Sequence, residues 1–171
     1  MPDTMVPRVQ ERVLPLAGRA IDAPRVRVRA LGPSSRWIVR GAPPLAVPRE
    51  ACRALVEGDR AVLWLGPDEW LVLAPDGTRL DAIEGGSVVE VSHRQVGLSV
   101  DGPSGAALLL AGCPLDLEAQ PAGFCTRTVL GKAEAVLWRE AEDRWRVEVW
   151  RSFAAYAWAL LEEVARVLPN G

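Results

Sequence analysis

The feature that most constrains the fold is a pair of apolar runs separated by a short polar turn. From Ala61 to Ala74 the chain reads AVLWL, GPDE, WLVLA. Pro67 fixes φ for the second position of a turn, and Asp68 suits the third. The pattern predicts a β-hairpin in which Asp68 and Glu69 are exposed, either as simple turn residues or as binding residues.

Alternating apolar and polar residues predict further strands along the chain. Val26, Val28 and Ala30 alternate with arginines, which is typical of a strand with one buried face. The other predicted strands cover residues 37–39, 88–91, 96–100, 132–138 and 144–149. The last two flank an acidic turn and form a second hairpin. Four tryptophans lie in the two hairpins, where we expect them to pack in the core rather than stack on a ligand. They are Trp64, Trp70, Trp138 and Trp145.

Three helices are predicted from apolar spacing and from the residues at their ends. Residues 48–56 and residues 103–110 each have a proline near the start and a glycine just past the end, so both are predicted as short helices. The clearest helix runs over residues 152–168, because one face of it is apolar. That face comprises Phe153, Ala157, Leu160, Leu161, Val164 and Leu168.

Two parts of the chain echo each other at an offset of roughly 70 residues. AVLWLGPDEWLVL at Ala61 resembles AVLWREAEDRWRVEV at Ala135, and ALGPSS at Ala30 resembles VDGPSG at Val100. Each half therefore has a strand, a turn or helix, and a hairpin that carries tryptophan. We predict a single α+β domain of mainly antiparallel sheets with helices, built from two related halves, in preference to a doubly wound parallel sheet.

The first residues of the chain differ from the rest in pattern and in charge. Residues 1–23 show no sustained periodicity and contain several prolines, so we predict an extended arm over 1–23 and a folded domain over 24–171. Arginines outnumber acids over residues 1–41, and guanidinium groups suit ion pairs across protein interfaces. A solvated strand face is the alternative explanation. The candidate interface residues in the arm are Arg8, Arg12 and Arg19.

Composition argues against several classes of protein. A formal net charge of −2 argues against nucleic-acid binding. No apolar run approaches the roughly 20 residues that a membrane span needs, and the N-terminus lacks an apolar signal core, so we expect a cytoplasmic protein that binds no membrane. Cys52, Cys113 and Cys125 have no CxxC spacing and accompany a single histidine. We expect buried or inert thiols rather than disulfides or zinc ligands.

The single histidine, His93, lies in the segment EVSHRQ at the end of a predicted strand. A nucleophilic site needs a serine within its reach, but strand neighbours such as Ser92 and His93 point to opposite faces. A pairing of His93 with Cys113 or Cys125 stays open, and the sequence lacks both G-x-S-x-G and G-x-G-x-x-G. We predict no catalytic, cofactor-binding or metal-binding residues in this chain. His93 then forms hydrogen bonds at a turn or, with Arg94, contacts another subunit.

Four segments taken together resemble the gamma subunit of heterotetrameric sarcosine oxidase. They are residues 61–73, VVEVSHRQVGLSVDGPSGAALLLAGCPLDL at 88–117, GFCTRTVLGKAEAVLWR at 123–139 and VEVWRSFAAYAWALL at 147–161. They occur in the family's order and cover most of the chain from residue 61 to residue 168. The resemblance implies a fold similar to the folate-binding domain of glycine-cleavage aminomethyltransferases, although Glu90 stands where those transferases commonly have Asp.

The resemblance also implies a function. The complex would demethylate sarcosine oxidatively to glycine, forming hydrogen peroxide and either formaldehyde or methylene-tetrahydrofolate, within one-carbon metabolism. Its alpha and beta subunits would hold FAD, FMN, NAD and tetrahydrofolate, and its delta subunit zinc. This chain would be a structural subunit without a cofactor of its own, docked chiefly on alpha. The alternatives are a stand-alone folate-binding or aminomethyltransferase-like protein and an orphan scaffold that kept only the fold.

Overall fold

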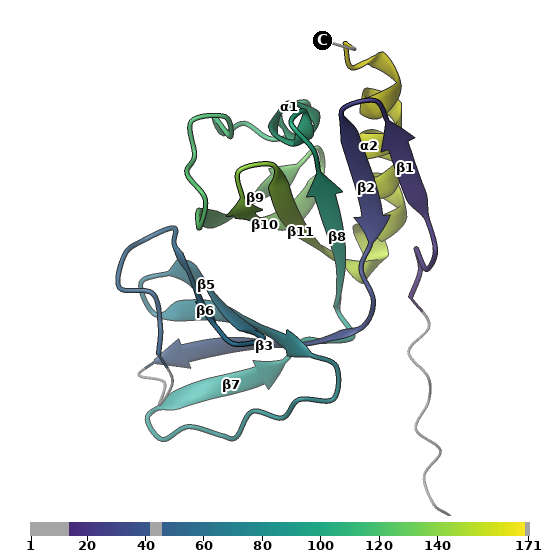
Figure 1. Ribbon diagram of the computed structural model, residues 1–171. Coiled ribbons are helices and arrows are strands. Elements are labelled where there is room, and N and C mark those ends of the chain that lie inside the picture. Colours follow the sequence, from purple (N-terminus) through teal and green to yellow (C-terminus); the bar gives the residue numbers. More distant parts are fainter. Residues whose placement is uncertain (1–13, 42–45, 170–171) are drawn as a thin grey trace, which may run out of the picture.

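The structure of the protein is a computed structural model that describes residues 14–41 and 46–169. Its strands form two antiparallel sheets (Figure 1). The six-stranded sheet has the order β1-β2-β8-β11-β10-β9, and the five-stranded sheet has the order β4-β5-β6-β3-β7. The first sheet comprises β1 (Ala20–Ala23), β2 (Val26–Ala30), β8 (Gln95–Asp101), β9 (Cys125–Leu130), β10 (Ala133–Ala141) and β11 (Arg144–Trp150). The second comprises β3 (Ser34–Gly41), β4 (Ala54–Glu57), β5 (Arg60–Gly66), β6 (Glu69–Pro75) and β7 (Gly86–Glu90).

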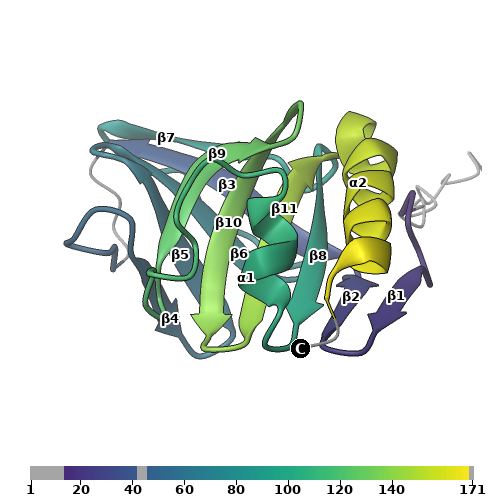
Figure 2. The same ribbon diagram turned by 90° about the horizontal axis from the view of Figure 1, so that it is seen from above.

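The elements are arranged in three layers, which Figure 2 shows from above. Helices α1 (Gly105–Leu110) and α2 (Ala154–Val167) cover one face of the six-stranded sheet, and a 3-10 turn, η1 (Arg151–Phe153), precedes α2. The five-stranded sheet covers the other face. The central strands β8, β10 and β11 are therefore largely buried on both faces, whereas β1, β2 and β9 nearer the edges keep exposed residues.

The alternation of side chains explains how one strand serves both layers. In β8, Val96, Leu98 and Val100 are buried in the core that the sheet shares with the helices. The residues between them, including Gly97, face the five-stranded sheet. A smaller apolar cluster, which includes Leu63, Leu71 and Val136, fills the space between the sheets. The outer face of the five-stranded sheet carries a third cluster, beneath loop residues such as Leu80 and Ile83.

Both predicted hairpins are confirmed. They are β5–β6 and β10–β11, and each has a register irregularity close to its turn, between Trp64 and Gly66 in the first and between Arg139 and Ala141 in the second. The sequence echo thus corresponds to two hairpins that share a local distortion. The other predicted strands are also present, whereas β1, β4 and β9 were not predicted.

The predicted helix over residues 48–56 is wrong. Ala54–Glu57 is instead the edge strand β4, which pairs with β5, and Arg53 forms a bridge to Phe124. Cys52 has a φ of 57°, in the left-handed region, which interrupts a right-handed helix. Tertiary pairing with β5 outweighs the local end signals here, because four residues gain a sheet partner that a short helix would lack.

The predicted arm enters the described part of the chain at residue 14. Leu16 is buried in the core on the helix side, and Ala20–Ala23 pair with β2 as an edge strand. The described part of the predicted arm therefore packs against the rest of this chain. Arg8 and Arg12 lie outside the described residues, and the division of the chain at residue 23 stays a prediction.

The predicted helices over residues 103–110 and 152–168 are confirmed as α1 and α2. The buried face of α2 differs in detail from the predicted one, because Phe153 belongs to η1 and is 40% exposed. The residues of α2 that are buried are Ala154, Ala157, Trp158, Leu161 and Ala165.

Replacing Leu98 by alanine tests the central position of β8. Leu98 is fully buried between the sheet and the helices, so Leu98→Ala should lower the free energy of unfolding by about 2–5 kcal/mol. Val167 is 74% exposed on α2, and Val167→Ala should change it by no more than about 0.5 kcal/mol. Urea unfolding of the full chain measures both, and similar losses in the two variants would contradict this packing.

Candidate functional site

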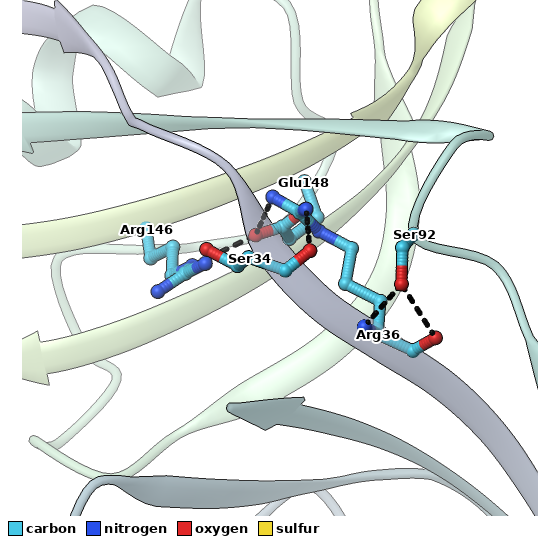
Figure 3. Close-up of polar contacts among 5 residues, drawn as sticks. All are labelled: Ser34, Arg36, Ser92, Arg146 and Glu148. Carbon is cyan, nitrogen blue, oxygen red and sulfur yellow. Dashed lines mark hydrogen bonds and ion pairs between the residues drawn. The ribbon is translucent and has the colours of Figure 1, made fainter. Parts of the chain in front are cut away.

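A buried ion pair joins the two sheets at the centre of the molecule (Figure 3). Arg36 of β3 donates from Nε to Glu148 Oε2 at 2.7 Å and from Nη2 to Oε1 at 3.2 Å. Its Nη1 donates to the carbonyl of Ser34 at 2.9 Å. Arg146 of β11 donates from Nε to Glu148 Oε1 at 2.8 Å. One carboxylate therefore holds two guanidinium groups from two sheets.

Strand periodicity places these charges inside. Val147 and Val149 of β11 are buried on the helix side, so Arg146 and Glu148 point to the other sheet. Gly97 makes room for them, since a Cβ atom there would lie 2.8 Å from Glu148 Oε1 and 3.1 Å from Arg36 Nη2. The ion pair thus depends on a glycine in the neighbouring strand.

The electrostatics keep Glu148 ionised. Burial by itself would raise the pKa of Glu148, but the charges and hydrogen bonds of Arg36 and Arg146 outweigh burial and hold the pKa below its ordinary value. A carboxylate in this state accepts no proton near neutral pH, and both of its oxygens already accept hydrogen bonds from guanidinium groups. The group therefore acts as a link between the sheets and not as a general acid or base.

The EVSHRQ turn is anchored to both sheets. Ser92 is buried; its Oγ accepts the backbone N–H of Arg36 at 2.9 Å and donates to Glu90 Oε1 at 2.8 Å. On the other side, the carbonyl of Arg94 accepts the N–H of Arg151 at 2.7 Å. His93 is exposed. The structure thus separates Ser92 and His93, one inside and one outside, as predicted, although they lie in the turn between β7 and β8 and not on a strand.

A second ion cluster centres on Glu69. Its Oε2 pairs with Arg40 of β3 and its Oε1 with Arg127 of β9. Burial opposes ionisation, but these two arginines lower the pKa of Glu69 below its ordinary value. The expectation that Glu69 is exposed is wrong, because its carboxylate turns inward to bridge two sheets, whereas Asp68 is exposed. This cluster makes the GPDE turn part of the contact between the sheets.

A cavity of about 340 Å³ opens beside the Glu69 cluster, at the edge of the space between the sheets. Its lining includes Arg40, Glu69, Val89, Arg94, Arg127 and Trp150, and we call it the Arg94 cleft. The guanidinium of Arg94 lies over the Trp150 ring, 5.0 Å from its centroid. Both residues predicted at the EVSHRQ turn, His93 and Arg94, are exposed, and Arg94 lines the cleft.

A second cavity of about 310 Å³ lies between the sheets near the first ion pair. Trp138, Glu140 and Arg146 contribute to its lining. Burial raises the pKa of Glu140, against the opposing charges of Arg146 and Arg144. Nη2 of Arg146 is buried and has no hydrogen-bond partner among the described residues.

The three cysteines and Arg19, which the sequence also singles out, lie outside the two ion clusters. The three cysteines are free thiols, of which Cys113 and Cys125 are buried and Cys52 is half-buried. Burial raises the pKa of Cys125 to about 12, so it carries no thiolate at neutral pH. The guanidinium of Arg19 lies over Trp158 of α2 at 5.5 Å from the ring centroid, on the helix side and not beside Arg94. The described residues hold no group of three or more His, Cys, Asp or Glu that could bind a metal ion.

The sheets and helices define the class of protein. The fold is similar to that of part of the glycine cleavage system aminomethyltransferase T from Bartonella henselae. The TM-score is 0.58 at 12% sequence identity, and the likeness covers 80% of this chain and 45% of that chain. No helix in the described part of the chain is long and apolar enough to cross a membrane.

Within that class, the chain belongs to the sarcosine oxidase gamma subunit family, whose model matches residues 29–166. Sarcosine oxidase subunit gamma of Corynebacterium sp. (strain P-1) is 36% identical over 110 residues, which are 59% of this chain and 54% of that protein. The Arthrobacter sp. subunit gamma is 36% identical over 96 residues, or 51% of this chain and 47% of that protein. The chain thus matches about half the length of these curated relatives.

A solved structure supports the same assignment. A chain of the heterotetrameric sarcosine oxidase from Corynebacterium sp. U-96, in complex with pyrrole 2-carboxylate, matches with a TM-score of 0.77 at 25% identity. The match covers 86% of this chain and 87% of that chain. The resemblance found in the sequence is confirmed.

Removing the charge of Glu148 should weaken the link between the sheets. Glu148→Gln leaves Arg36 buried without its counterion, so we expect the free energy of unfolding to fall by about 3–5 kcal/mol. In the double variant Arg36→Met, Glu148→Gln the loss should be smaller than the sum of the two single losses, because neither member of the Arg36–Glu148 pair is left buried as a charge without the other. Urea unfolding of the four chains measures the difference, and strictly additive losses would contradict a direct interaction.

The same carboxylates predict acid sensitivity. The pKa values of Glu148 and Glu69 are lower in the folded chain than the value of about 4.3 in an unfolded one, so their stabilisation is complete above that value. It is lost as the pH falls through the lowered folded pKa values, while Glu140, whose pKa is raised, acts in the opposite direction. Urea unfolding measured between about pH 7 and pH 3 checks this. The urea concentration at the midpoint should decrease once the pH is below about 4.3, and it should decrease less steeply for Glu148→Gln. An equal slope in this variant would contradict the assignment.

Proposed function

We propose that this chain is the gamma subunit of a heterotetrameric sarcosine oxidase and that its role there is structural. The complex oxidatively demethylates sarcosine to glycine and reduces oxygen to hydrogen peroxide, and the methyl carbon leaves as formaldehyde or methylene-tetrahydrofolate. In this proposal the chain docks chiefly on the alpha subunit, beside beta and delta. The observation that carries the proposal is its family membership over residues 29–166, together with the likeness to 87% of a chain of a heterotetrameric sarcosine oxidase.

The contacts between the sheets support a structural role. Glu148 and Glu69 are each engaged by two arginines, and the hydroxyl of Ser92 is bonded to Glu90. These groups hold the two sheets and the EVSHRQ turn together. Glu148, Glu69 and Ser92 are therefore committed to internal contacts.

The cofactors of the proposed complex are assigned to its other subunits. FAD, FMN, NAD and tetrahydrofolate would be held by alpha and beta, and zinc by delta. Cys113 and Cys125 are buried in apolar surroundings, and the part of the chain that the structure describes brings no set of three metal-binding side chains together. This chain would supply binding surface and rigidity to the complex, in the cytoplasm.

Co-expression with the large subunits tests the proposal. We expect this chain to co-purify with a tagged alpha subunit in a stable complex that oxidises sarcosine, and we expect a lower yield of assembled complex when the chain is left out. A chain that never co-purifies with the large subunits contradicts the proposal. If that chain alone also releases heat on titration with tetrahydrofolate, the folate-binding alternative is correct instead.

A further inference from the structure

We propose that the Arg94 cleft is the docking site for the large partner subunit, which inserts a polypeptide segment with a carboxylate side chain flanked by apolar residues. This inference rests on the proposed function, because it needs a partner subunit. It also gives a role to the exposed side chain of Arg94 in the EVSHRQ turn, which takes no part in the ion pairs between the sheets.

The positive charge of the cleft is more accessible than its negative charge. The carboxylate of Glu69 is only 10% exposed and has both oxygens engaged, whereas the side chains of its partners Arg40 and Arg127 are 57% and 36% exposed. A guanidinium group has five N–H donors, and each of these pairs uses only part of that set. Glu69 therefore holds the guanidinium groups of Arg40 and Arg127 side by side. Each of them keeps N–H donors that Glu69 does not use and from which another anionic group can accept hydrogen bonds.

Arg94 adds a third cation from another direction. It is exposed, and its guanidinium stacks on Trp150 at 5.0 Å from the ring centroid. The indole Nε1 of Trp150 donates to Glu134 Oε1 at 3.1 Å, which fixes the ring on which Arg94 rests. Glu134 is half-exposed, lies 4.0 Å from Arg127, and is the second carboxylate in the lining of the cleft. Three guanidinium groups thus face two carboxylates, and both carboxylates have partners within the cleft.

The cleft also exposes large apolar side chains. Val89 of β7 is 54% exposed and Trp150 of β11 is 36% exposed, and both line the cleft from opposite sheets. Arginine and tryptophan together at a partly open cavity are typical of the anchoring residues of protein interfaces. Covering exposed apolar surface of this kind with a partner stabilises the complex.

The shape of the site favours a polypeptide over a small anion. β7 is the last strand of its sheet, and its outer edge has no strand partner among the described residues. Ser87 and Val89 of this strand line the cleft. A partner segment lying along β7 would gain backbone hydrogen bonds at the edge while its side chains reach the cleft. Its carboxylate would complete the charge balance of Arg40, Arg94 and Arg127.

Reversing the charge of Arg94 tests the docking site. The probe is the tagged large subunits, co-expressed with the full chain carrying Arg94→Glu, or with Trp150→Ala as a second variant that removes the stacking ring. We expect each variant to bind the large subunits at least about tenfold more weakly than the wild type. The matched control is Arg79→Glu, an exposed arginine in the loop that packs on the opposite face of the five-stranded sheet, which should bind normally.

The outcomes separate this inference from the proposed function. If the wild-type chain fails to assemble with the large subunits, the proposed function fails. If it assembles and both cleft variants assemble equally well, with unchanged thermal unfolding, the docking site is wrong while the function stands. Wild-type assembly that weakens with added salt, and weakens less steeply for Arg94→Glu, supports the inference. If malonate raises the thermal unfolding temperature of the isolated chain and both variants assemble normally, the cleft is a small-anion site. This result overturns the inference.

Discussion

The arrangement of this molecule depends on a carboxylate buried between two sheets. Glu148 is 1% exposed and Arg36 is 2% exposed, so neither charge could be tolerated there without the other. The pair crosses from β11 to β3 beside Gly97, and the backbone of Arg36 in turn anchors Ser92 and the EVSHRQ turn. An ion pair of this kind contributes little net free energy compared with a well-packed apolar pair, but its two members must lie opposite each other for either charge to be buried.

Much of the fold follows from the sequence, and the exceptions lack a clear local signal. Alternation and turn residues predict the two tryptophan hairpins, β2, β3, β7, β8 and both helices, because these signals are local. The edge strand β4 was predicted as part of a helix, since only its pairing with β5 makes it a strand. The strand β9 was not predicted, because its alternation of half-buried and exposed residues has no apolar run.

The polar centre could not be predicted for a related reason. Glu148 lies between two buried valines of one strand, which indicates a residue on a solvated face, and Arg36 was counted among the solvated or interface arginines of the N-terminal region. A second sheet covers that face, and the local sequence pattern does not predict that the sheet lies there. Glu69 was expected to be exposed because it was assigned to the turn of the first hairpin. By contrast, the exposed position of His93 and Arg94 follows from their place at a strand junction, which the sequence does show.

The two ion clusters use their arginines in two different ways. Arg36 lies wholly inside and fixes the sheets, whereas Arg40 and Arg127 use one fork on Glu69 and keep the rest of their guanidinium groups at the surface. Lysine could not do this, because a single ammonium has no planar fork with which to hold one carboxylate while presenting donors to a second. The same contact that fastens the sheets therefore also sets the positions of the cationic groups on the outside. The internal links of this chain therefore determine the shape and the charge of this part of its surface.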